Sequence, residues 1–242
     1  MDRQTRHQLK QDEFRGSLEH VEEYFKKHYK EIINITVIVV VVVGLAAGLR
    51  FYTDRQDAQA NTDLGTALQT FRAYVGQPQP GSTEPGVATF ATAEAKYKMA
   101  LGQFQAIVDK YKMIPRPQAV AVARYQAGVC QALLEDHAAA VQTLQEASNG
   151  RDREIASLAK FALAGELAKT GKVAEAAKLY QELADHPTMS LPKAEALMAM
   201  ADAYRSSQPA QARQIYERIG KEFATSAAIS SSIRQQIESL TP

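Results

Sequence analysis

The residues that could carry out chemistry are few in this chain, and they lie far apart in the sequence. The five histidines are His7, His20, His28, His137 and His186. No two of them have the HExxH spacing of a zinc protease, and no cysteine and histidine cluster has the spacing of a metal site. A glycine-rich phosphate loop and a GxSxG nucleophile motif are also missing from the sequence. The sequence therefore indicates no catalytic residue, no cofactor and no metal, and it does not favour an enzyme.

The single cysteine, Cys130, lies in an alanine-rich helical pattern. Because it has no partner in the sequence, the fold cannot depend on an intramolecular disulfide. We expect a small buried apolar side chain here, in preference to the alternative of a reactive thiol.

The charge balance excludes one class of partner. Residues 53–242 carry 20 Lys and Arg and 20 Asp and Glu, so the formal net charge of this part is zero. A nucleic-acid binder needs a basic field that neutralises phosphates. We therefore expect no nucleic-acid partner.

Residues 32–49 read IINITVIVVVVVGLAAGL and contain no charged side chain. A helix needs about 20 mostly apolar residues to cross a bilayer. Aromatic residues flank this run, with Tyr29 on one side and Phe51 and Tyr52 on the other. Aromatic side chains are common at the level of the lipid headgroups. A cleaved signal peptide would need a short basic leader, whereas residues 1–31 carry seven acidic residues, and a buried strand would be shorter. We predict an uncleaved transmembrane helix over residues 32–52.

The basic residues on the two sides of this run predict its orientation. Four Lys and Arg lie within residues 12–31 and two lie within residues 50–69. Lys and Arg concentrate on the cytoplasmic side of a membrane. Residues 1–31 are therefore predicted to be cytoplasmic and residues 53–242 extracytoplasmic, which is the periplasm in a Gram-negative bacterium.

The extracytoplasmic part has the composition and the period of a helical repeat. Strong helix formers dominate it, and turn signals such as Asn149-Gly150 and Thr170-Gly171 divide it. Ala140, Ala176 and Ala212 are each 36 residues apart. This resembles the tetratricopeptide repeat, whose period is about 34 residues, over roughly residues 55–223.

We predict an all-α solenoid of about four helical hairpins. The first hairpin is stretched by an insertion at residues 76–86, and residues 226–240 form a capping helix. Small residues at Gly65, Gly128 and the three alanines are expected where the two helices of a hairpin touch closely.

The first helices of such hairpins line a concave surface that binds partners. Placed on the repeat, six residues form this predicted surface, which we call the concave row: Tyr125, Val129, Phe161, Met198, Asp202 and Arg205. In the alternative arrangement, the insertion or the capping helix covers the row.

Two further patterns concern the membrane and the cytoplasm. Phe14, Leu18, Val21 and Phe25 form a helical apolar stripe, either for docking on a membrane partner or as a solvated extension of the anchor. Within the span, Gly44, Ala47 and Gly48 permit close helix packing with a second copy, which would give a homo-oligomer, or with another membrane protein.

The order of these parts resembles a known family. The segment EHVEEYFKKHYKEI leads into one span that ends at Arg50-Phe51-Tyr52, and a helical repeat follows. This is similar to the YfgM-like family, the membrane-anchored tetratricopeptide ancillary subunits of the bacterial Sec translocon. The resemblance implies a location in the bacterial inner membrane, with the Sec translocon and periplasmic chaperones as partners. Two alternatives remain: an envelope-assembly or cell-division scaffold, and an enzyme that uses the repeats for docking.

Overall fold

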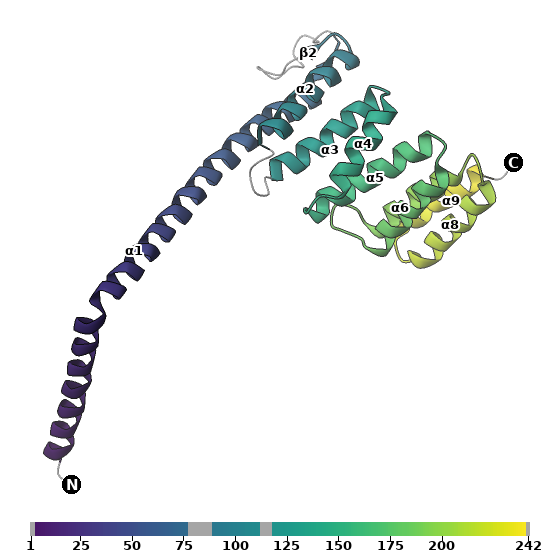
Figure 1. Cartoon of the computed structure of the whole chain (residues 1–242). Coiled ribbons are helices and arrows are strands. Elements are labelled where there is room, and N and C mark those ends of the chain that lie inside the picture. Colours follow the sequence, from purple (N-terminus) through teal and green to yellow (C-terminus); the bar gives the residue numbers. More distant parts are fainter. Residues whose placement is uncertain (1–2, 77–88, 112–117, 241–242) are drawn as a thin grey trace, which may run out of the picture. The chain divides into compact units, whose positions relative to one another are not determined.

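The computed structural model describes residues 3–76, 89–111 and 118–240, and its description of side chains begins at His28 and omits Ile32, Ala227 and Ala228. Helices dominate the described residues, as the sequence predicted (Figure 1). Contacts divide the protein into two units, Met1–Arg55 and Gln56–Pro242. Helix α1 (Arg3–Arg72) contributes residues to both units.

The first unit contains a long apolar stretch of α1. Its large apolar side chains from Ile33 to Leu49 are 52–66% exposed, so none of the described residues shields them. The helix is long and apolar enough to cross a membrane. Cationic groups lie over aromatic rings at both ends of the stretch. Lys30 Nζ is 5.8 Å from the ring centre of Tyr29, and the Arg55 guanidinium is 4.6 Å from that of Phe51.

The second unit is a row of antiparallel helical hairpins (Figure 1). Hairpin 1 pairs the last part of α1 with α2, hairpin 2 pairs α3 with α4, hairpin 3 pairs α5 with α6, and hairpin 4 pairs α7 with α8; α9 follows. The helices after α1 are α2 (Ala93–Tyr111), α3 (Gln118–Leu133), α4 (His137–Ser148), α5 (Arg153–Lys169), α6 (Val173–Asp185), α7 (Lys193–Tyr204), α8 (Pro209–Glu222) and α9 (Ala227–Ser239).

Local sequence explains where these helices begin and end. The Asp152 carboxylate accepts hydrogen bonds from the backbone N–H groups of Glu154 at 3.0 Å and Ile155 at 3.2 Å, which caps α5. Gly171 has a φ of +84° in the turn between α5 and α6, a conformation that favours glycine. Pro209 opens α8, where a missing N–H costs no hydrogen bond. The turns predicted at Asn149-Gly150 and Thr170-Gly171 are confirmed.

Two short strands bracket the predicted insertion. β1 (Tyr74–Val75) pairs in parallel with β2 (Thr89–Phe90), with Tyr74 opposite Thr89 and Val75 opposite Phe90. The Gly76 N–H also donates to the Phe90 carbonyl oxygen at 2.9 Å. Residues 77–86 of the insertion lie outside the described residues.

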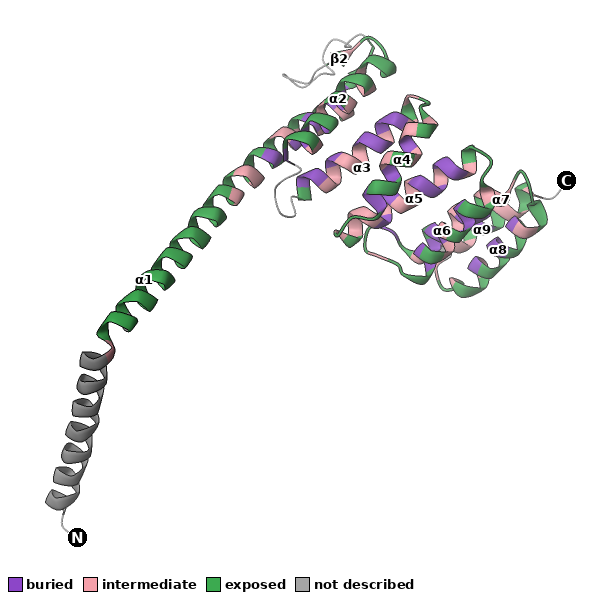
Figure 2. Cartoon of the chain, viewed as in Figure 1, coloured by how far each residue is buried: buried purple, intermediate pink, exposed green. Residues whose placement is uncertain are grey.

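Buried residues mark the sides on which the helices face one another (Figure 2). The three alanines of the 36-residue period, Ala140, Ala176 and Ala212, are all fully buried. A Cβ atom added at Gly128 would lie 2.7 Å from Cγ and Cδ2 of Leu144, so α3 and α4 touch closely there. Gly65 differs, because a Cβ at this position would meet no atom within 4 Å. The expected close contact at Gly65 is therefore wrong.

Helix α9 caps the C-terminal end of the core, as predicted. Ile233 is 2% exposed, and Ile229, Ile237 and Leu240 pack beside it. The opposite side of α9 carries Ser231, Arg234, Gln235 and Glu238, which are exposed. A polar outer face of this kind ends a solenoid, because a further hairpin would find no apolar surface to cover.

Candidate partner-binding surface

The first helices of the hairpins form the inner layer of the solenoid. Contacts across the hairpin boundaries join α3 to α5 and α5 to α7. Packing first helices against one another curves the row toward them, which makes their free side the concave one. The concave row lies on these three helices, with Tyr125 and Val129 on α3, Phe161 on α5, and Met198 and Asp202 on α7.

The apolar members of the concave row are half-buried. Tyr125, Phe161 and Met198 each pack one side against the main core. The Phe161 ring lies edge-on to that of Tyr180, with the ring centres 5.4 Å apart. Burial raises the pKa of Tyr125. The core holds these side chains in place and leaves part of each accessible.

The polar members of the row already have partners inside the protein. The Arg205 guanidinium donates to Asp202 at 2.9 Å, to the Tyr216 hydroxyl at 3.0 Å and to Ser239 Oγ at 3.3 Å, and it also bonds Gln236. The Tyr216 hydroxyl donates to Asp202. Arg205 therefore ties α7 to α8 and α9, which gives it a structural task in addition to the predicted one.

A buried carboxylate that the sequence analysis missed lies beside this layer. Glu166 on α5 is 3% exposed, yet one of its oxygens is 2.7 Å from His137 Nδ1 and the other is 2.7 Å from Lys169 Nζ. Burial raises the pKa of Glu166, but the hydrogen bonds from Lys169 and His137 outweigh it and the net shift is downward. The position of Glu166 among the buried Leu163, Ala164 and Leu167 was the available signal.

The remaining predicted residues fall on α1. Gly44, Ala47 and Gly48 are exposed, and a Cβ at either glycine would meet no atom within 4 Å. The side chains of Phe14, Leu18, Val21 and Phe25 lie outside the described residues, so the structure describes only the backbone helix of this predicted stripe.

The described side chains provide no centre for metal or thiol chemistry. No group of three His, Cys, Asp or Glu that could hold a metal ion occurs among them. Cys130 is buried, and burial raises its pKa to about 12, so the thiolate is scarce at neutral pH. The prediction of a small buried side chain at Cys130 is confirmed.

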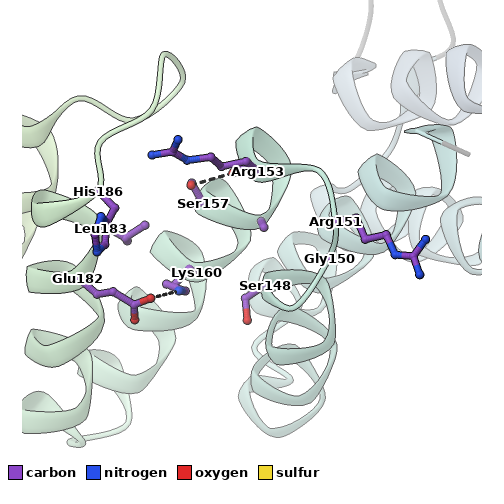
Figure 3. A pocket seen from close by; sticks show the side chains of 10 residues that line it. Ser148, Gly150, Arg151, Arg153, Ser157, Lys160, Glu182, Leu183 and His186 are labelled. Carbon is purple, nitrogen blue, oxygen red and sulfur yellow. Dashed lines mark hydrogen bonds and ion pairs between the residues drawn. The ribbon is translucent and has the colours of Figure 1, made fainter. Parts of the chain in front are cut away.

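A cavity of about 250 Å³ lies at the open end of hairpin 3 (Figure 3). Lys160 on α5 and Glu182 on α6 form an ion pair across its mouth. The Ser157 hydroxyl is bonded within its own helix, because it donates to the Arg153 carbonyl oxygen at 2.8 Å. The Lys160 and Glu182 side chains of this cavity are therefore paired with each other, and the Ser157 hydroxyl is bonded within α5.

Comparison with known proteins agrees with this architecture. A tetratricopeptide repeat family model matches residues 195–226, which correspond to hairpin 4 and the turn after it. No match to the sequence was found among curated proteins or solved structures. The hairpins and this match define a tetratricopeptide-like repeat region. Proteins of this class present extended surfaces to other proteins, and the fold is typically an interaction scaffold without enzymatic activity.

Proposed function

We propose that this protein is a membrane-anchored interaction module, an ancillary subunit of the bacterial Sec translocon that links the channel to periplasmic chaperones. The observation that carries the proposal is the combination of an exposed apolar helix with a tetratricopeptide-like solenoid in one polypeptide. The apolar helix provides an anchor and the solenoid provides a surface for another protein.

The distance between anchor and solenoid in the sequence supports a partner at the membrane. Seven residues separate Tyr52 from Ala60, the first fully buried residue of the second unit. Even when fully extended, such a segment reaches at most about 30 Å. This short segment supports a role near the bilayer, where polypeptides leaving a translocation channel first appear.

The concave row is the proposed contact surface. Tyr125, Phe161 and Met198 occur one each in hairpins 2, 3 and 4, and each is half-buried against the core. Side chains that are fixed before binding lose little conformational entropy on contact. Aromatic anchors of this kind commonly supply much of the binding energy at an interface. We expect Phe161 to contribute most, because Tyr180 holds its ring in place.

Site-specific photo-crosslinking in intact membranes tests this proposal. A photoreactive side chain at Phe161 should crosslink a translocon subunit or a periplasmic chaperone. The same group at Lys178, an exposed position on α6, is the matched control and should not. Crosslinks from Phe161 to envelope-assembly or cell-division proteins alone would favour the scaffold alternative and contradict the translocon role.

Replacement of Tyr125 and Phe161 by serine separates an open surface from a core. If the row is a contact surface, the double variant should lose the crosslinked partner with little loss of stability. A drop of about 3–5 kcal/mol in the free energy of unfolding for each replaced residue, typical of large-to-small core changes, would show instead that the row is core.

The predicted orientation is tested by a reporter. A reporter that is active only outside the cytoplasm, fused after Pro242, should be active. Activity of a cytoplasmic reporter alone would exclude contact with periplasmic chaperones.

A further inference from the structure

A second cavity, of about 660 Å³, lies at the open end of hairpin 2. It is formed by the first half of α3, the end of α4 and the turn between α4 and α5. Val120 and Ala147 are 8% and 5% exposed and form part of an apolar floor. Arg124, Glu146 and Arg151 stand around this floor as charged groups. None of these residues belongs to the concave row.

The cavity repeats the one in hairpin 3 at a spacing of 36 residues. Arg124 corresponds to Lys160, and Glu146 corresponds to Glu182. In hairpin 3 the two charges form an ion pair across the mouth. In hairpin 2 no hydrogen bond or ion pair joins Arg124 to Glu146 among the described residues. The larger cavity, in hairpin 2, therefore lacks the ion pair that crosses the mouth of the equivalent cavity in hairpin 3.

Two guanidinium groups beside the apolar floor have no partner within the described part of the protein: those of Arg124 and Arg151. Figure 3 shows the Arg151 side chain directed away from the Lys160–Glu182 pair. A guanidinium offers a planar fork of donors that matches a carboxylate in a bidentate manner. Such charge-assisted hydrogen bonds are about twice as strong as neutral ones.

The two carboxylates that line this cavity, those of Glu146 and Asp152, form no ion pair with either arginine among the described residues. The Asp152 carboxylate caps α5 through the N–H groups of Glu154 and Ile155, and it accepts a third hydrogen bond from Gln118 Nε2 at 3.4 Å. Glu146 is exposed and forms no ion pair within the described residues. A ligand carboxylate would therefore find two available donors, with the charge of Glu146 acting against it.

The geometry points to a second binding site, which takes a polypeptide segment carrying a bulky apolar side chain next to a carboxylate. The apolar side chain would cover Val120 and Ala147, and the carboxylate would lie between Arg124 and Arg151. The carboxylate can belong to an acidic side chain or to the free C-terminus of a polypeptide, because both present the same two oxygens.

Fluorescence polarisation on the full-length protein in nanodiscs of uncharged lipid tests this site. The probe is a fluorescein-labelled hexapeptide of alternating leucine and glutamate with an amidated C-terminus. Peptides of alternating leucine and lysine, and of alternating serine and glutamate, should bind much more weakly. A leucine–serine peptide with a free C-terminus, compared with its amidated form, reports whether a terminal carboxylate is sufficient.

Removing a basic side chain and removing an acidic side chain at this site should have opposite effects on the affinity for the leucine–glutamate peptide. Arg124→Gln and Arg151→Gln should each weaken the leucine–glutamate peptide about tenfold, as expected for the loss of a charge-assisted hydrogen bond. Glu146→Gln should strengthen binding, and raising the salt concentration should weaken it. Lys160→Gln, at the equivalent position of hairpin 3, is the matched control and should change nothing.

The proposal fails if the leucine–lysine peptide binds as well as the leucine–glutamate peptide, or if none of the carboxylate peptides binds at about millimolar concentration. It also fails if Glu146→Gln leaves the affinity unchanged, and this result stands even where an arginine variant folds poorly. Loss of crosslinking at Phe161 does not bear on this site, because the concave row and the cavity share no residue.

Discussion

The carboxylate of Glu166 lies 2.7 Å from Nδ1 of His137, and this contact joins hairpin 3 to hairpin 2. The two residues are 29 positions apart in the sequence. A nearly buried carboxylate is stable only when its oxygens are hydrogen-bonded. Here one oxygen of Glu166 is hydrogen-bonded to His137, and the other is hydrogen-bonded to Lys169.

This contact predicts a pH-dependent contribution to stability. Glu166→Gln should lower the free energy of unfolding by about 1–3 kcal/mol near neutral pH, because it removes charged hydrogen bonds of a buried group. The net pKa shift of Glu166 is downward. Its contribution is therefore present above the pKa of the unfolded state and is lost as the pH falls through the folded pKa. Urea unfolding at several pH values should show wild type and variant converging in acid, and a constant difference would contradict the prediction.

The close contact of α3 with α4 predicts that a larger residue at position 128 destabilises the protein. In Gly128→Ala the new methyl group would lie 2.7 Å from two side-chain carbons of Leu144, so the Leu144 side chain or one of the two helices must shift. We expect destabilisation of about 1–3 kcal/mol, as for other overpacked cores. Gly65→Ala is the matched control, because its methyl group meets nothing within 4 Å and alanine favours helix by about 1 kcal/mol. Thermal unfolding measures both, and equal melting temperatures would contradict the packing.

Arg205 predicts how firmly α9 is held. Arg205→Gln should remove the bonds to Gln236 and Ser239, and the amides of α9 should then exchange faster with deuterated water. Arg213→Gln is the control, since the partner of Arg213 among the described residues is Glu217 on the surface of the same helix, α8. Hydrogen exchange followed by mass spectrometry distinguishes the variants. Unchanged exchange in α9 would show that Ile233 and its neighbours hold the cap alone.

Cys130 should be inert in the folded protein. It is fully buried, and burial raises its pKa to about 12. Iodoacetamide at pH 8 should label it slowly in the native state and rapidly in denaturant, because the thiolate is the reacting form. Fast native labelling would mean that α3 opens locally more readily than its packing indicates.

The repeat could be predicted from sequence because its determinants are local. Ala140, Ala176 and Ala212 recur at one spacing, and each is fully buried. The capping helix follows from the helical spacing of Ile229, Ile233 and Ile237. The close contact predicted at Gly65 was wrong, because a small residue indicates such a contact only where atoms of another helix lie near it.

The candidate surfaces depended on relationships that no local pattern contains. Asp202 and Arg205 belong to the predicted concave row, but only the structure shows that they are bonded to Tyr216 and α9. Arg124 and Lys160 are equivalent in the repeat, yet Lys160 has an ion pair and Arg124 has none among the described residues.

By itself the sequence determined that this protein has one apolar stretch long enough to span a membrane and a 36-residue helical repeat. Both follow from side-chain type at regular spacing, which acts within one helix or one hairpin. Only the tertiary structure decided which polar groups are paired, how far Tyr125 and Phe161 are buried, and where an open cavity remains. These features arise between hairpins, where contacts join residues that are far apart in the sequence. Such contacts depend on the conformation of each side chain.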